Sequence, residues 1–224
     1  MEYIKKILRK YKIISIILSY IYTHLIGLNK IRGLRHNKIE FNNCFLKKCK
    51  IRIKGTNNKV FINNHSTLFC CKISITGNDN TIIIDERVCA VKCEIYIEDN
   101  NNLVKIGKDS HISGLTHLAC IEGCNIIIGE KCLFSSDVTF RTGDSHSILD
   151  LDGIRINPSL DIEIGNHVWI GNKTIITKGV SIAENCIIAT GSVVTKKFDD
   201  SNVIIGGIPA KIIKRNVNWD ELRI

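Results

Sequence analysis

A histidine in a polar stretch is the strongest candidate for chemistry in this sequence. His146 ends the triplet Asp144-Ser145-His146, inside a largely polar run from 141 to 161. A neutral imidazole with an ordinary pKa of about 6.5 is suited to accept a proton at neutral pH, so we predict that His146 is a general base. Asp144 is a candidate for orienting the imidazole, as the third member of a catalytic triad does, unless the two side chains point in opposite directions.

Covalent and metal chemistry have no comparable motif here. No cysteine or serine stands in a nucleophile motif, so no covalent intermediate is expected. His111 and His117 are six residues apart and are expected at successive corners of one coil. A third ligand with suitable spacing is not evident, so we predict no metal site. His167 is interpreted as a structural turn residue.

The stretch that must position these residues repeats every six residues. This spacing fits neither an α-helix, at about 3.6 residues per turn, nor an amphipathic strand, at about 2. It is typical of a solenoid with one short strand and one turn per unit, in which three units close a triangular coil. The aliphatic residues are expected to fill the interior, and the small residues after them to let the backbone turn. The repeating residues are Ile164, Ile170, Ile176, Ile182, Ile188 and Val194.

A second repeat, of 22 residues, runs through positions 41–128. Each unit is predicted to be a strand, a Gly/Asn/Asp turn that tolerates positive φ, and another strand, so the early coils are longer than 18 residues. The Asn-rich corners are interpreted as structural. Cysteines at this spacing are expected to be buried, free thiols in a reduced, cytosolic chain. The repeating residues are Cys49, Cys71 and Cys93 in one register, and Ile62, Ile84, Ile106 and Ile128 in another.

The two ends of the chain differ from the repeats. We predict an N-terminal basic, amphipathic or apolar helical segment over 1–38, a β-helix domain over 39–205 with an excursion loop at 141–161, and a tail over 206–224 that ends in a short helix. The apolar run at 13–28 is shorter than the ~20 residues that span a bilayer, and no signal cleavage site follows it. Its basic flanks favour a helix at the cytoplasmic face of a membrane. The alternative is a helix that caps the solenoid or packs in an oligomer.

The charge of the chain points to an anionic partner. Its net charge of +9 could meet nucleic acid, an anionic membrane or a phosphorylated ligand. Aromatic residues make up only 6% of the chain and do not alternate with basic ones. No base-stacking surface is therefore predicted, and nucleic acid is not expected as a partner.

Four segments together resemble the hexapeptide-repeat O-acetyltransferases, above all those of bacterial capsules, lipopolysaccharide and sialic acid, and also the maltose and galactoside acetyltransferases. The resemblance covers residues ~128–215, with Thr190 where the family often has Gly. It implies an all-β solenoid, a left-handed parallel β-helix. The segments are Asp144-Ser-His-Ser147, Arg155-Ile-Asn-Pro158, Ile164-Gly-Asn-His-Val-Trp-Ile-Gly171, and Gly191-Ser-Val-Val-Thr-Lys196 with Gly207-Ile-Pro-Ala-Lys211.

The resemblance also implies a reaction and its participants. Acetyl-CoA would be the co-substrate, a hydroxyl of a surface-polysaccharide sugar the acceptor, and His146 the base. The enzyme would be a homotrimer with sites between subunits, cytoplasmic or peripheral on the inner face of the cell membrane. The alternatives are an N-acetyltransferase of nucleotide-linked amino sugars, a small-molecule acetyltransferase, and a non-catalytic solenoid that binds or scaffolds.

Three groups of residues are expected to serve this reaction. Trp169 would pack beside the thioester, and backbone N–H groups of Gly171, Ala189 and Gly191 would bind the pantetheine amides. Basic residues would bind the phosphates of CoA, with a solvated surface as the alternative for each. The remaining candidates for CoA are Lys178, Thr190, Lys196, Lys197, Ile208, Pro209, Lys211 and Arg215, and those for the acceptor are Thr142, Ser145, Arg155 and Asn157.

Overall fold

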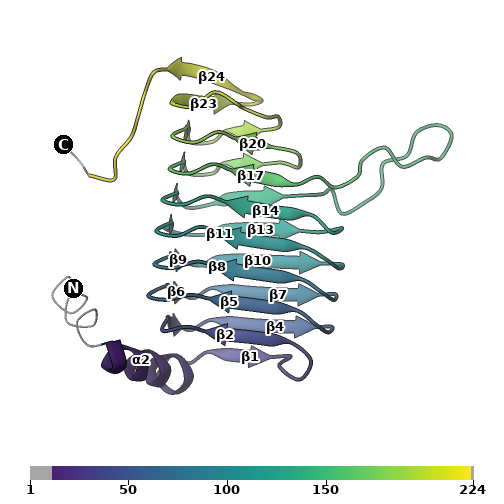
Figure 1. The fold of residues 1–224 in the computed structure, drawn as a ribbon. Coiled ribbons are helices and arrows are strands. Elements are labelled where there is room, and N and C mark those ends of the chain that lie inside the picture. The colour runs from purple at the N-terminus through teal and green to yellow at the C-terminus, as the bar shows by residue number, and fades with distance from the viewer. Residues whose placement is uncertain (1–11, 223–224) are drawn as a thin grey trace.

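The structure, a computed structural model, describes residues 12–222 as a column of stacked coils (Figure 1). Three parallel sheets, here called faces A, B and C, form its sides. Face A contains β1 (Lys30–Arg32), β4 (Lys50–Lys54), β7 (Lys72–Thr76), β10 (Cys93–Glu98), β13 (Thr116–Cys120), β16 (Val138–Arg141), β19 (Ile175–Ile176) and β22 (Val193–Val194).

Faces B and C complete each coil. Face B contains β2 (Lys38–Phe41), β5 (Lys59–Ile62), β8 (Thr81–Ile84), β11 (Leu103–Ile106), β14 (Asn125–Ile128), β17 (Ile162–Ile164) and β20 (Ser181–Ile182). Face C contains β3 (Phe45–Lys47), β6 (Thr67–Phe69), β9 (Cys89–Val91), β12 (His111–Ile112), β15 (Leu133–Phe134), β18 (Trp169–Ile170), β21 (Ile187–Ile188) and β23 (Val203–Gly207), and ends with β24 (Ala210–Arg215), which pairs antiparallel to β23.

Both predicted periods are confirmed by the strand register. Ile164 pairs with Ile182, and Ile170 with Ile188, so the upper coils advance by 18 residues. In the lower coils Ile51 pairs with Ile73, an advance of 22. The six aliphatic residues of the hexads are all buried. The solenoid is the left-handed parallel β-helix that the family resemblance implies.

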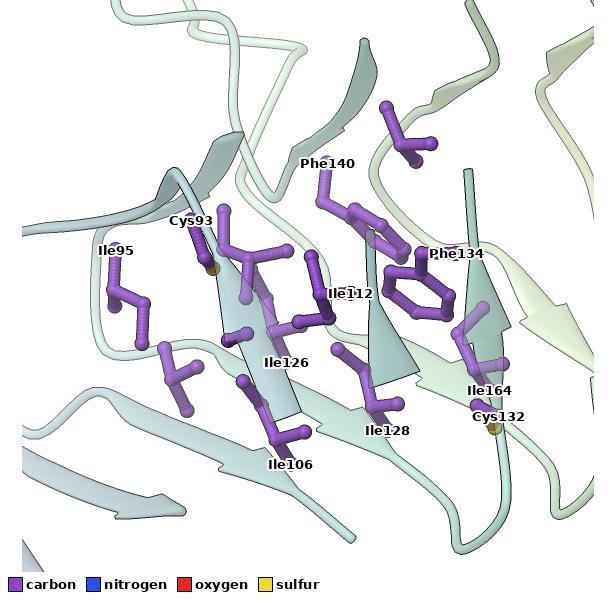
Figure 2. Packing of buried hydrophobic residues seen from close by; sticks show 14 of the residues in the cluster. Cys93, Ile95, Ile106, Ile112, Ile126, Ile128, Cys132, Phe134, Phe140 and Ile164 are labelled. Carbon is purple, nitrogen blue, oxygen red and sulfur yellow. The ribbon is translucent and has the colours of Figure 1, made fainter. Parts of the chain in front are cut away.

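Close packing of successive coils explains the glycines that follow the aliphatic residues. A Cβ on Gly171 would lie 2.6 Å from the backbone nitrogen of Thr190 in the next coil. Inside the column, buried hydrophobic residues from neighbouring coils stack on one another (Figure 2). The rings of Phe134 and Phe140 lie 5.5 Å apart in this stack. Because the interior is this dense, the corner positions are fixed and can hold a site rigidly.

The Asn-rich corners form a buried ladder of side-chain amides. Asn80 Nδ2 donates to Asn58 Oδ1 at 3.0 Å, and Asn102 Nδ2 donates to Asn80 Oδ1 at 2.9 Å. Asn58 in turn donates to Asn37 Oδ1 at 2.9 Å. Turn residues beside the ladder, such as Asn57 and Asp79, have positive φ, as predicted. The structural interpretation of these corners is confirmed.

The prediction of buried thiols is also confirmed. Cys49, Cys71 and Cys93 lie one above another in the interior. Burial raises the pKa of the Cys93 thiol to about 12, so it stays protonated at neutral pH. Eight cysteines are buried thiols outside any disulfide, namely Cys44, Cys49, Cys71, Cys93, Cys120, Cys124, Cys132 and Cys186.

A helical segment covers the N-terminal end of the column (Figure 1), where α2 (Lys12–Ile21) continues into a π-helical turn, η1 (Tyr22–Ile26). The part of the predicted N-terminal segment before residue 12 lies outside the described residues. Within residues 12–222, no helix is both long and apolar enough to cross a bilayer.

The predicted C-terminal helix is wrong over the residues that the structure describes. Residues 216–222 carry no helical turn. Val217 N donates to Asn202 O at 3.0 Å, and Trp219 Nε1 donates to His167 O at 2.9 Å. Because these contacts bind the tail to the wall of the column, it follows the wall in an extended form.

Candidate active site

The excursion loop, residues 142–161, leaves the column at the corner between faces A and B (Figure 1). Thr142 begins it and is fully buried, and its Oγ1 accepts a hydrogen bond from Ile121 N at 2.9 Å. Leu160 N donates to Thr142 O at 2.9 Å and fixes the returning strand of the loop. Thr142 therefore anchors the loop, and its hydroxyl does not face an acceptor sugar as expected from the resemblance.

The distal part of the loop is a hairpin. Leu149 and Arg155 form an antiparallel bridge, and Asp150 Oδ1 accepts hydrogen bonds from Asp152 N at 3.0 Å and Ile154 N at 2.8 Å. Five apolar side chains of the hairpin are exposed, those of Ile148, Leu149, Leu151, Ile154 and Ile156. The predicted excursion loop is therefore an arm with its own hydrogen-bonded structure.

Asn157 joins the two strands at the root of this arm. Its Nδ2 donates to Asp144 Oδ2 and to His146 O, both at 2.8 Å, and its Oδ1 accepts from Ile148 N at 2.7 Å. The side chain is buried, and these partners use both of its amide protons. Asn157 positions the backbone of His146, a different role from the acceptor contact implied by the resemblance.

Arg155 also serves the loop. Its Nη2 lies 2.8 Å from Glu122 Oε1 on the adjacent coil and donates to Asn157 O at 3.2 Å. The guanidinium holds the pKa of Glu122 below its usual range. This ion pair ties the arm to the column, so Arg155 is occupied within the chain.

Asp144 does not orient His146 in this structure. Its carboxylate accepts from Lys178 Nζ at 2.5 Å and from Asn157, and no contact joins it to the His146 ring within the described residues. The hydrogen bond from Lys178, and then that from Asn157, hold the pKa of Asp144 below its usual range. Lys178 therefore fixes the loop to the coil above and is not free for a phosphate.

Replacing Lys178 with Met should raise the pKa of Asp144 towards the ordinary aspartate value of about 3.9. The pKa of Asp144 is lower in the folded chain than in the unfolded chain. The pair with Lys178 therefore stabilises the loop at pH values above the unfolded pKa. Its contribution is lost as the pH falls through the folded pKa. NMR titration of the Asp144 carboxyl carbon measures the change, and Lys173→Met, at an exposed lysine of the same coil, is the control. An unchanged Asp144 titration would show that the pair does not form in solution.

A cavity of about 200 Å³ lies on face A beside the loop, lined by Tyr96, His117, Ala119, Ile121, Arg141, Gly143 and Ser145. Register explains it, because Ala119 stands between Tyr96 and Arg141 on adjacent strands and leaves a gap between two large side chains. Arg141 Nη2 donates to Ser145 Oγ at 2.8 Å and keeps further donors. Burial lowers the pKa of His117.

The sequence analysis did not predict that Tyr96, His117 and Arg141 line one cavity. The repeat could have placed Tyr96 and Arg141 on one side, because Tyr96, Ala119 and Arg141 occupy the same position in successive strands. His111 lies on face C near Glu221, and His117 lies on the next face of the same coil, face A, as their spacing of six predicted.

Trp169 lies on face C and points outward, as expected, with 37% of its surface exposed. Its neighbour is Trp219 of the C-terminal tail, with ring centroids 6.1 Å apart. Trp219 stacks on His167 at 4.3 Å and is buried. The sequence analysis gave Trp219 no role, although it is one of only two tryptophans in the chain.

The backbone N–H groups expected to bind pantetheine are already used within the chain. Gly171 N donates to Ile188 O, and Ala189 N donates to Ile205 O, both at 2.8 Å. Gly191 N donates to Asn172 O at 2.8 Å. These bonds join successive coils, so the prediction that these amides are available donors is wrong. Thr190 beside them is exposed, as are Ile208 and Pro209 in the β23–β24 turn.

Three predicted phosphate-binding lysines share one groove at the C-terminal end of the column. Lys196, Lys197 and Lys211 line a hollow of about 520 Å³ together with Phe198, Asp199, Asp200 and Ile212. Arg215 pairs with Asp200 at 2.9 Å at its border. Lys196 follows Lys178 by 18 residues and so occupies the same corner one coil further along.

The candidate residues therefore divide between two sides of the column. His146, Asp144, Lys178 and Lys196 lie at or beside the corner between faces A and B. Trp169 lies on face C, which is opposite that corner in a three-sided column. The excursion loop and the C-terminal tail leave opposite sides in Figure 1. One copy of the chain does not bring His146 and Trp169 together.

Known proteins share this architecture. Residues 161–196 match the bacterial transferase hexapeptide family (six repeats). The chain is 39% identical over 97 residues to the polysialic acid O-acetyltransferase of Escherichia coli O1:K1 / APEC, a match that spans 43% of this chain and only 31% of that protein.

Two solved structures match most of the column. The crystal structure of the polySia specific acetyltransferase NeuO has a TM-score of 0.76 at 31% identity, over 87% of this chain and 85% of that one. The polysialic acid O-acetyltransferase OatWY has a TM-score of 0.77 at 29% identity, over 88% of this chain and 89% of that one. With these matches and its hexapeptide repeats, the chain belongs to the hexapeptide-repeat acetyltransferase family.

Proposed function

We propose that this chain transfers the acetyl group of acetyl-CoA to a hydroxyl of a bacterial surface-polysaccharide sugar. The observation that carries the proposal is His146, held on an ordered arm beside a cavity of a column similar to two polysialic acid acetyltransferases.

The proposed reaction uses His146 twice. Its neutral imidazole accepts the hydroxyl proton while the hydroxyl oxygen bonds to the thioester carbonyl carbon of acetyl-CoA. The tetrahedral species then breaks its carbon–sulfur bond, and the imidazolium returns the proton to the leaving CoA sulfur. The backbone contact from Asn157 to His146 O keeps the imidazole at this place.

The cavity on face A is our candidate for the acceptor. Arg141 retains guanidinium donors that suit a carboxylate, and Ser145 and Tyr96 supply hydroxyls for a sugar. A carboxylate-bearing sugar such as sialic acid fits this lining. The groove lined by Lys196, Lys197 and Lys211 suits the phosphates of CoA, as point charges for a loosely held anion.

We further propose a homotrimer with the site between subunits. The separation of His146 from Trp169 supports it, because a groove between two copies would place the loop of one beside face C of the other. The reaction would take place in the cytoplasm, where buried thiols such as Cys93 stay reduced.

Measuring CoA release tests the reaction. Purified protein with acetyl-CoA should release CoA when a sialylated polysaccharide is added, and Arg141→Gln should raise the KM for that acceptor by about tenfold or more, the value of one charged hydrogen bond. A neutral polysaccharide is the control, because its KM should not depend on Arg141. Release with amino sugars alone would support the N-acetyltransferase alternative, and no release with any acceptor would support the binding protein.

A further inference from the structure

The helix at the N-terminal end of the column has a polar inward face and an apolar outward face, the reverse of an ordinary surface helix. Its inward face consists of Ser15, Ser19 and Thr23, spaced by four residues and all buried. Ser15 Oγ donates to Asn43 Oδ1 at 3.0 Å, and Thr23 Oγ1 donates to Cys44 O at 2.8 Å. These bonds dock the helical segment on the first coil and cap it.

The outward face of the same segment is apolar. Large side chains with about half or more of their surface exposed follow one another along it, and Ile13 and Leu25 are exposed to 74% and 73%. A contiguous apolar face of this kind marks a contact with a membrane or another protein. The exposed residues are Ile13, Ile14, Ile16, Ile17, Leu18, Tyr20, Leu25, Ile26 and Leu28.

Positive charge is concentrated in the N-terminal part of the sequence, which includes this helical segment. Residues 1–60 contain 15 Lys or Arg and 2 Asp or Glu, a net charge of +13, whereas the whole chain carries +9. The remaining residues, 61–224, are therefore net acidic, at −4. Exposed cations on and beside the first two strands of face A are Lys30 and Arg32 of β1, Arg35, Lys48 and Lys50.

From this geometry we infer that the α2 end of the column binds end-on to an anionic lipid bilayer. The segment α2–η1 lies in the interface with its apolar side chains among the acyl chains, and the surrounding cations contact anionic headgroups. Ser15 and Thr23 join this helical segment to the first coil of the column. Capping and membrane contact, which the sequence presents as alternatives, then belong to opposite faces of one helix.

Charge complementarity favours a bilayer over a second copy of the chain. A two-fold contact through this face would place its exposed cations opposite their own counterparts. Like charges brought together at an interface disfavour the contact. An anionic surface neutralises the same cations and accepts the apolar side chains.

Vesicle flotation of the full-length protein tests the inference. The protein should float with phosphatidylglycerol–phosphatidylethanolamine vesicles and stay behind with phosphatidylcholine alone. The variant Ile17→Asp/Tyr20→Asp should lose flotation, because it puts carboxylates into the interface. The matched control is Ile154→Asp/Ile156→Asp, two apolar hairpin residues of similar exposure, which should float like the unaltered protein.

A charge variant separates the electrostatic part. Lys30→Gln/Arg32→Gln/Arg35→Gln should lower partitioning by about a hundredfold, since each cation near an anionic surface contributes about fivefold. Lys131→Gln/Lys173→Gln/Lys214→Gln, three exposed cations further along the column, should change it little. Light scattering without lipid completes the test, and circular dichroism checks that each variant is folded. Equal flotation of the unaltered protein and the Ile17/Tyr20 variant would overturn the inference. If the unaltered protein does not bind vesicles and that variant has a lower oligomer mass, the face contacts a second copy of the chain instead.

Discussion

Replacing His146 with Ala should lower the turnover of acetyl-CoA with a polysaccharide acceptor by about 10²–10⁴-fold, the usual contribution of a general base. The imidazole ring is exposed on the arm and makes none of the contacts that hold it. Those contacts use the backbone carbonyl of His146, which the substitution retains. The loss should therefore lie in proton transfer, with the fold unchanged.

Binding measurements distinguish this loss from a structural one. The His146→Ala variant should bind CoA as the unaltered protein does in calorimetry, whereas Trp169→Ala should weaken acetyl-CoA binding with a smaller loss of turnover. If the His146 variant retains more than about a tenth of the turnover at neutral pH, His146 is not the base. His117 would then be the better candidate, because it lines the cavity and burial keeps its imidazole neutral.

Replacing Asn80 with Ala should lower the free energy of unfolding by about 3–5 kcal/mol, because several buried polar groups lose partners at about 1–3 kcal/mol each. Asn80 Nδ2 donates to Asn58 Oδ1 and to Asp99 O, and its Oδ1 accepts from Asn102 N and Nδ2. The side chain is completely buried, so water cannot replace these bonds.

Denaturant unfolding at fixed protein concentration measures this cost. Asn64→Ala is the matched control, because the Asn64 side chain is exposed and contacts Glu86 at 3.4 Å, and it should change stability by less than about 0.5 kcal/mol. A cost below about 1 kcal/mol for Asn80→Ala would mean that the ladder adjusts around a gap.

The sequence predicts the column well because its repeats determine which side chains face the interior and which residues stack in successive coils. Ile164 and Ile182 stack as the spacing of six requires, and Asn58, Asn80 and Asn102 form the ladder that their 22-residue spacing indicates. Handedness is different, since spacing alone is the same in either hand. It came from the family resemblance.

The site was harder to predict because its contacts join segments with no common period. Asp144 meets Lys178 only because the loop returns against the next coil. The amide of Gly171 donates to Ile188 O of the next coil, and the sequence does not reveal that this donor is already used. Trp219 reaches His167 because the tail turns back along the wall, where periodicity gives no information.

The stacking of strands in face A determines how far the excursion loop lies from the N-terminal end of the column. Five steps separate β1, beside the N-terminal helix, from β16, where the excursion loop starts. At roughly 4.8 Å for each step, the loop stands about 24 Å above that end. A glycan anchored at the surface on which the column rests must rise this far before any of its hydroxyls can reach His146, so units nearer the anchor would escape modification. Removing one 22-residue coil would shorten the column by one step and move the boundary towards the anchor by the same amount.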